Sequence, residues 1–106
     1  MAKKMRDIMT AAMFQQSALE KEIKGNVRTY LRWKGWKVIY NKQGMGSEPG
    51  IADVLIVKKG RHIMIETKTI RNNQFEKQKI FQRDWEAHGG EYMLVRSVQD
   101  LIDAGL

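Results

Sequence analysis

The segment "PGIADVLIVKKGRHIMIETKT", residues 49–69, decides the fold of this chain. It contains two runs rich in Val, Ile, Leu and Met, at residues 51–58 and 61–69, which meet at Lys59 and Gly60. Branched apolar residues favour β-strands, and a short connection that contains Gly is typical of a hairpin. We therefore predict two neighbouring antiparallel strands in this segment.

Three charged residues interrupt these apolar runs: Asp53, Glu66 and Lys68. Side chains alternate across a strand, so Glu66 and Lys68 share a face. Counting outward from the turn places residue 53 nearly opposite residue 66, so the two carboxylates are expected to approach each other. Close carboxylates repel, and an unpaired buried charge is costly. Two interpretations follow: a structural network that Lys68 neutralises, or a site for a divalent cation, which prefers oxygen ligands.

The rest of the chain is expected to surround this hairpin with helices and further strands. Three segments begin with Ser or Asn and carry an acidic residue three positions later, which is the spacing of an N-terminal capping box. The expected helices begin at Ser17, Asn73 and Ser97, and the expected strands cover residues 36–41, 51–58, 61–69 and 91–96. The order helix, three strands, helix, strand, helix predicts an α/β (α+β) fold in which helices pack on a small mixed sheet.

Length and composition predict one folded domain. A chain of 106 residues cannot support two cores. We assign residues 17–106 to this domain and residues 1–16 to an amphipathic N-terminal helix that could form a dimer interface. The absence of cysteine excludes disulfides and fits a cytoplasmic protein. No segment approaches the roughly 20 apolar residues of a membrane span, so no membrane partner is expected.

The charge balance is strongly basic. The chain has 19 Lys and Arg against 12 Asp and Glu, for a net charge of +7. Bases are spread over both halves of the chain rather than gathered in a tail. Such an excess favours a polyanionic partner, most often nucleic acid, although a basic soluble surface without a partner gives the same composition.

The ordered motifs resemble those of the PD-(D/E)XK nuclease superfamily. "GIAD" stands where that superfamily has proline-aspartate, and "ETK" supplies the E-x-K element thirteen residues after Asp53. More narrowly, residues 19–104 resemble the virus-type replication-repair nuclease (VRR-NUC) family in its compact standalone form from phages and bacteria, through "LEKEI", "LRWKG", "QKIF" before "GG", and "VRSVQDL". Ala52 replaces the common proline, which loosens the turn before Asp53 but keeps the ligand.

This resemblance implies a restriction-endonuclease-like αβββαβ core in which a glutamate of the first helix joins the two strand carboxylates. Glu20 matches that position, and Glu22 is the second choice because it lies on another helix face. Glu20 also has the spacing of a capping-box residue after Ser17. Gln78 matches the motif of the later helix, where we expect it to orient Lys68 or a phosphate oxygen.

The resemblance also implies metal-dependent hydrolysis of DNA. We expect Mg²⁺ or Mn²⁺ to be held by Asp53, Glu66 and the backbone carbonyl of Thr67, with Glu20 acting through a water molecule. Lys68 would hold the attacking water or stabilise the pentavalent phosphate.

The family's standalone members imply a homodimer that cuts branched DNA, such as a four-way (Holliday) junction or a flap, in DNA repair or phage genome processing. Two other functions stay open: a catalytically inactive nucleic-acid-binding module, and a sequence-specific restriction-type endonuclease. Candidate phosphate contacts are Lys42, Lys58, Lys59, Arg61, Arg71 and Lys77.

Overall fold

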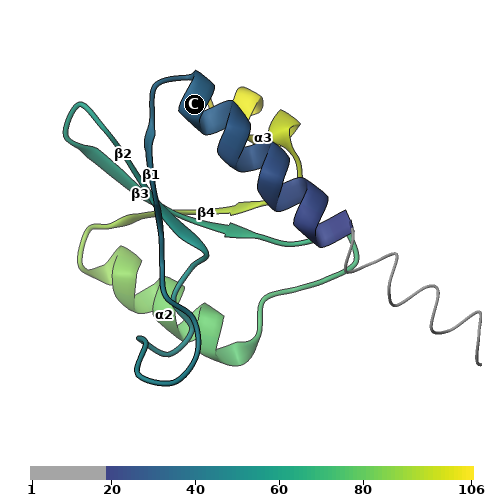
Figure 1. Ribbon diagram of the computed structural model, residues 1–106. Coiled ribbons are helices and arrows are strands. Elements are labelled where there is room, and N and C mark those ends of the chain that lie inside the picture. Colours follow the sequence, from purple (N-terminus) through teal and green to yellow (C-terminus); the bar gives the residue numbers. More distant parts are fainter. Residues whose placement is uncertain (1–18) are drawn as a thin grey trace, which may run out of the picture.

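A computed structural model of the chain describes residues 19–106. The expected N-terminal helix, the dimerisation segment at residues 1–16 and the Ser17 cap lie outside the described residues. Within residues 19–106, no helix combines the length and hydropathy needed to cross a lipid bilayer. A helix through residues 19–33 precedes β1 (Lys37–Tyr40), β2 (Val54–Lys58), β3 (Arg61–Thr67), α2 (Glu76–Ala87), β4 (Glu91–Val95) and α3 (Val98–Asp103), as Figure 1 shows.

This order of elements confirms the predicted mixed α/β class with helices flanking a small sheet. The four strands are arranged in the order β1-β2-β3-β4. The pairs β1–β2 and β2–β3 are antiparallel, whereas β3 and β4 are parallel. Parallel strands need a crossover connection, and α2 provides it.

The hairpin between β2 and β3 has the predicted turn. Lys58 pairs with Arg61, so Lys59 and Gly60 form a two-residue connection with φ angles of 48° and 82°. Both angles lie in the left-handed region, as a type I′ hairpin turn requires, and Gly adopts this region without steric penalty. The ladder continues to the pair Val54 and Ile65, which brings residues 53 and 66 to the same end of the hairpin.

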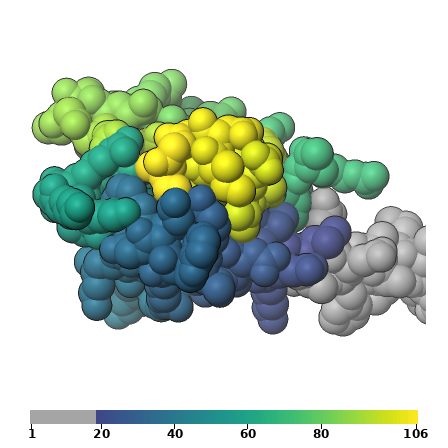
Figure 2. All heavy atoms as spheres, turned by 90° about the horizontal axis from the view of Figure 1, so that it is seen from above, coloured from purple at the N-terminus to yellow at the C-terminus, as the bar shows by residue number. Residues whose placement is uncertain are grey.

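The helices cover the two faces of the sheet unequally. Figure 1 shows the helix of residues 19–33 and α3 on one face and α2 on the other, and Figure 2 shows the first helix beside the C-terminal residues. The hydroxyl of Tyr30 donates to the carbonyl of Leu106 at 3.1 Å, which ties the two segments together. The largest fully buried side chains of the core are Val27, Leu31, Val54, Ile56, Ile65, Val95 and Leu101.

The predicted start of α2 at Asn73 is wrong. The helix begins at Glu76 with Phe75 as its N-cap, and the N–H of Phe75 donates to Oε1 of Gln78 at 2.8 Å. Asn73 is engaged elsewhere, because its Oδ1 accepts from Nη2 of Arg96 at 3.3 Å. Arg96 also donates to the carbonyls of Thr69 and Asn72, so one guanidinium holds the loop that precedes the helix.

The closing helix begins where the sequence indicates, with Ser97 as the N-cap of α3. The hydroxyl of Ser97 makes no capping hydrogen bond. Oδ2 of Asp100 instead accepts from the backbone N–H of Arg96 at 2.8 Å. The acidic residue of the capping pattern therefore ties the helix to the end of β4.

Candidate functional site

The end of the hairpin brings the two strand carboxylates together. Asp53 lies one residue before β2, and its Oδ2 accepts from Thr67 twice, from the backbone N–H at 2.9 Å and from Oγ1 at 2.6 Å. Thr67 is buried at the end of β3, directly after Glu66. These two hydrogen bonds fix the Asp53 carboxylate at the end of β3, beside the Glu66 carboxylate.

Glu66 is a buried carboxylate, and only one of its two oxygens has a polar contact among the described residues. Its side chain is only 3% exposed. Burial, followed by the negative charge of Asp53, raises the pKa of Glu66 to about 7, although the ammonium groups of Lys68 and Lys24 oppose the rise. Its Oε2 has no hydrogen-bond partner among the described residues. A buried polar atom without a partner calls for an explanation, such as a bound ion.

Lys68 lies beside Glu66, as two residues on one face of a strand should. Its Nζ is 3.8 Å from Oε1 of Glu66 and 4.5 Å from the centre of the Phe75 ring. Lys68 is 6% exposed, whereas Phe75 is 71% exposed. Phe75 is the N-cap residue of α2, and its ring lies against the Lys68 ammonium. This contact helps to hold a buried cation at the site.

Gln78 contacts Glu66 rather than Lys68. Its Nε2 donates to Oε1 of Glu66 at 3.2 Å, and its Oε1 accepts from the Phe75 N–H. One amide therefore caps α2 and orients the Glu66 carboxylate. The structure links the start of α2 directly to the end of β3.

The first helix reaches this site through Lys24, a residue that the sequence analysis missed. Nζ of Lys24 is 3.5 Å from Oδ1 of Asp53 and 3.7 Å from Oε1 of Glu20. Glu20 is half-buried, whereas the second choice, Glu22, is exposed. The i,i+4 spacing of Glu20 and Lys24 could have indicated their pairing, but nothing in the sequence indicates the contact with Asp53.

The arrangement is a set of carboxylates bridged by ammonium groups. Within residues 19–106, no three Asp, Glu or His side chains converge on one point at which they could bind a metal ion. Asp53 and Glu66 supply two carboxylates at one end of the hairpin, and Glu20 is joined to Asp53 through Lys24. Oxygen ligands of this kind suit hard cations such as Mg²⁺ or Mn²⁺ and not soft ones.

A hollow of about 330 Å³ opens beside this cluster. It reaches Lys68 and lies between the first helix and the loop that precedes α2. Arg71, an expected phosphate contact, is exposed on its wall. Its lining residues are Glu20, Lys68, Arg71, Asn72, Asn73 and Phe75. The hollow therefore gives access to Glu20 and Lys68, whereas Asp53 and Glu66 are not among its lining residues.

The other expected phosphate contacts are spread over the surface. Lys42, Lys59 and Lys77 are exposed. Lys58 is half-buried, and its Nζ donates to the carbonyl of Lys34 at 2.8 Å, so it closes the end of the first helix.

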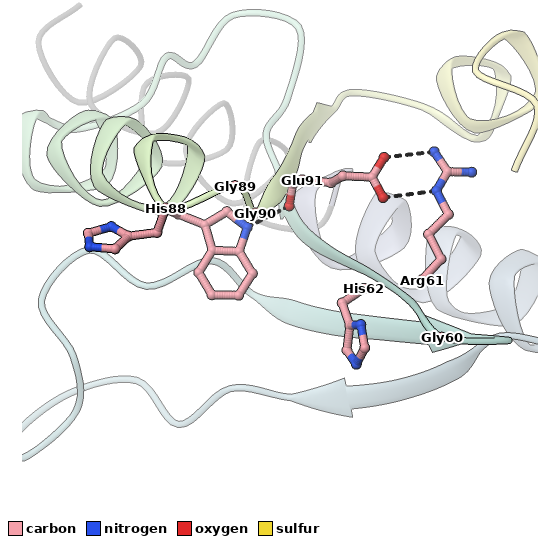
Figure 3. Close-up of a pocket in the computed structure, with 8 residues that line it drawn as sticks. Gly60, Arg61, His62, His88, Gly89, Gly90 and Glu91 are labelled. Carbon is pink, nitrogen blue, oxygen red and sulfur yellow. Dashed lines mark hydrogen bonds and ion pairs between the residues drawn. The ribbon is translucent and has the colours of Figure 1, made fainter.

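Arg61 lies at the far end of β3 from Glu66. Figure 3 shows its guanidinium facing the carboxylate of Glu91, with two contacts of 2.9 Å. The hydrogen bond from Arg61 lowers the pKa of Glu91. Both side chains line a second hollow of about 530 Å³, whose rim includes the exposed His62 and His88. Arg61 is therefore paired with a carboxylate and remote from the candidate site.

Comparisons of the chain with models of protein families, with curated proteins and with solved structures find no match. The functional interpretation therefore depends on the geometry of the Asp53, Glu66 and Lys68 cluster and on the motifs that it contains.

Proposed function

We propose that the chain is a metal-dependent DNA endonuclease that hydrolyses phosphodiester bonds in branched DNA. One observation carries the proposal. The hairpin brings the carboxylates of Asp53 and Glu66 together beside Lys68, and one buried oxygen of Glu66 has no partner among the described residues. Burying such a charge is costly for folding, so a function that uses it explains its presence.

The oxygen atoms at this position fit a hard divalent cation. Asp53, Glu66 and the backbone carbonyl of Thr67 would hold Mg²⁺ or Mn²⁺, and Glu20 would act through a water molecule. Mg²⁺ keeps several waters when it binds to proteins, so two carboxylates and one carbonyl suffice. The bound cation would neutralise phosphate charge and lower the pKa of a water molecule.

The remaining groups of the cluster have separate tasks. Lys68 presents a buried ammonium 3.8 Å from Glu66, where it can bind a phosphate oxygen or hold the attacking water. Gln78 fixes the orientation of the Glu66 carboxylate through its 3.2 Å contact. Thr67 fixes that of Asp53. Such fixed groups lower the barrier by positioning the reactants before the reaction begins.

Two features support DNA as the proposed substrate: the net charge of the chain and the resemblance of its motifs. A net charge of +7 favours a polyanion. The VRR-NUC resemblance of residues 19–104 supports branched DNA as the substrate and a homodimer as the active form. The contacts expected from Lys42, Lys58, Lys59, Arg61, Arg71 and Lys77 would position the phosphate backbone without reading bases.

A second function, a nucleic-acid-binding module without activity, is favoured by one observation. Each carboxylate already has an ammonium within 4 Å: Lys24 for Asp53, and Lys68 for Glu66. A self-neutralised cluster of this kind could be purely structural.

Cleavage assays separate these functions. The substrates are a labelled four-way junction, a flap and a linear duplex, each incubated with Mg²⁺, Mn²⁺ or EDTA. The proteins are the wild type, Asp53→Asn and Glu66→Gln, with Glu86→Gln as the matched control because Glu86 is an exposed carboxylate of α2.

We expect metal-dependent cutting of the branched substrates by the wild type and the control, and none by the two site variants. Folded wild type that binds DNA but cuts no substrate under any condition would contradict the proposal and favour the binding module. Discrete fragments from the linear duplex would instead indicate a restriction-type enzyme.

A further inference from the structure

From residue 23 onward, the first helix and the edge strand β1 carry charges of one sign. Residues 23–47 contain six Lys and Arg and no Asp or Glu. Three of their side chains form a cluster, which we call the arginine–tyrosine surface: Arg28, Arg32 and Tyr40. None of these residues belongs to the carboxylate cluster or to the phosphate contacts expected from the sequence.

The two guanidinium groups are held on the ring of Tyr40. The guanidinium carbon of Arg28 is 4.4 Å from the ring centre, and that of Arg32 is 5.4 Å from it. Nη2 of Arg32 also donates to the Tyr40 hydroxyl at 2.5 Å. Within residues 19–106, no carboxylate forms a salt bridge with Arg28 or Arg32. The aromatic ring therefore orders two cations whose charges stay available to an anion.

The helix dipole does not account for this pair. Cations stabilise a helix when they lie in its last turn, which suits Arg32 but not Arg28. Arg32 and Tyr40 are exposed and Arg28 is half-buried, so the cluster also contributes little to the core. Guanidinium groups offer several N–H donors in a plane, which matches phosphate oxygens.

The surface extends directly from the candidate site. Lys24, Arg28 and Arg32 are spaced at four-residue intervals, so they follow one side of the helix over about 12 Å. Lys24 contacts Asp53 at 3.5 Å, which places one end of the row at the carboxylates. Each strand of B-DNA presents a phosphate about every 3.4 Å along its axis. A row of this length laid parallel to the duplex axis would span about three to four phosphates.

We propose that Arg28, Arg32 and Tyr40 bind the sugar–phosphate backbone of a DNA strand that leaves the Asp53 and Glu66 site. The inference rests on the proposed function in taking DNA as the ligand and the Asp53 and Glu66 site as the place that the strand leaves. The arginines contact phosphates, and Tyr40 keeps their guanidinium groups in place. The contacts carry no base specificity, because phosphates are alike in every sequence.

The test is fluorescence anisotropy of a labelled four-way junction in EDTA, at several salt concentrations, with the full chain. The charge-removing variant is Arg28→Gln/Arg32→Gln. The matched control is Lys79→Gln/Arg83→Gln, which removes the same charge from exposed positions of α2. A third variant, Arg28→Lys/Arg32→Lys, keeps the charge, and circular dichroism melting confirms that each protein is folded.

We expect the Arg28→Gln/Arg32→Gln protein to bind about tenfold or more weakly near 0.1 M salt, with a salt slope smaller by about two, since each lost phosphate contact removes about 0.9 from the slope. The lysine variant should keep most of the slope, and the control should change little. Equal losses in the α2 control and the arginine variant would overturn the inference, as would unchanged binding by the arginine variant.

These outcomes are independent of cleavage. A chain that binds through this surface and cuts nothing would keep the proposed phosphate contacts and lose the nuclease. A chain that cuts branched DNA while the arginine variant binds normally would lose the inference alone.

Discussion

Replacement of Glu66 by glutamine should stabilise the protein while it removes activity. The Glu66 side chain is 3% exposed, and burial together with the charge of Asp53 raises its pKa from the ordinary value of 4.5 to about 7. One pKa unit corresponds to about 1.4 kcal/mol, so the ionised carboxylate costs the folded state about 3 kcal/mol at a pH above both values.

The pH dependence follows from the direction of this change. Because the pKa of Glu66 is higher in the folded chain, the folded chain holds the proton more tightly than the unfolded chain does. The stability from the protonated side chain is complete below pH 4.5 and is lost as the pH rises from 4.5 to about 7. Glutamine resembles the protonated acid at every pH and keeps an oxygen that can accept from Gln78.

Urea unfolding in EDTA, followed by tryptophan fluorescence, measures the effect. We expect Glu66→Gln to exceed the wild type by about 3 kcal/mol near pH 8 and to match it closely near pH 4.5. The control Glu86→Gln alters an exposed carboxylate and should show no such trend. A Glu66→Gln protein no more stable than the wild type near pH 8 would refute the reasoning, because the pairing with Lys68 would then outweigh the burial cost.

Three further substitutions probe the site and its support. Lys24→Met removes an ammonium that lies 3.5 Å from Oδ1 of Asp53 and would compete with a metal ion, so Mn²⁺ binding measured by calorimetry should tighten about fivefold. Gly50→Ala should destabilise the chain by about 2 kcal/mol or more in urea unfolding, because Gly50 has a φ of +72° and an added Cβ would clash with the carbonyl of Lys77. Leu101→Ala should cost about 2–5 kcal/mol in the same assay, because Leu101 is fully buried in the core.

The hairpin shows how far local sequence determines this fold. A two-residue turn at Lys59 and Gly60 sets the register, and the register alone brings residues 53 and 66 together. The prediction succeeded because strand pairing next to a tight turn depends on short-range geometry.

The predicted start of α2 was wrong because a long-range contact, rather than local sequence, decides it. Asn73 has the right residue type for a cap, but Arg96 from the end of β4 takes up its side-chain oxygen. Phe75 is an unusual N-cap residue, and its N–H is satisfied by the side chain of Gln78. A contact between residues 23 positions apart overrode a local signal.

The sequence also predicted only some of the charged contacts in and around the candidate site. The pairing of Glu66 with Lys68 follows from alternation along one strand. The contact of Lys24 with Asp53 and the stacking of Arg28 on Tyr40 join the first helix to the sheet. Such contacts depend on how a helix rotates and docks, which the spacing of residues along the chain does not determine.

Anomalous diffraction from crystals of the wild-type protein grown with Mn²⁺ tests the central claim most directly. We predict one strong peak in direct contact with carboxylate oxygens of Asp53 and Glu66, with the Lys24 ammonium displaced from Oδ1 of Asp53. An identically treated Glu66→Gln crystal should lack this peak. Wild-type crystals with no peak at these carboxylates, and with Lys24 and Lys68 still paired to them, would contradict the account and identify the cluster as a structural ion-pair network.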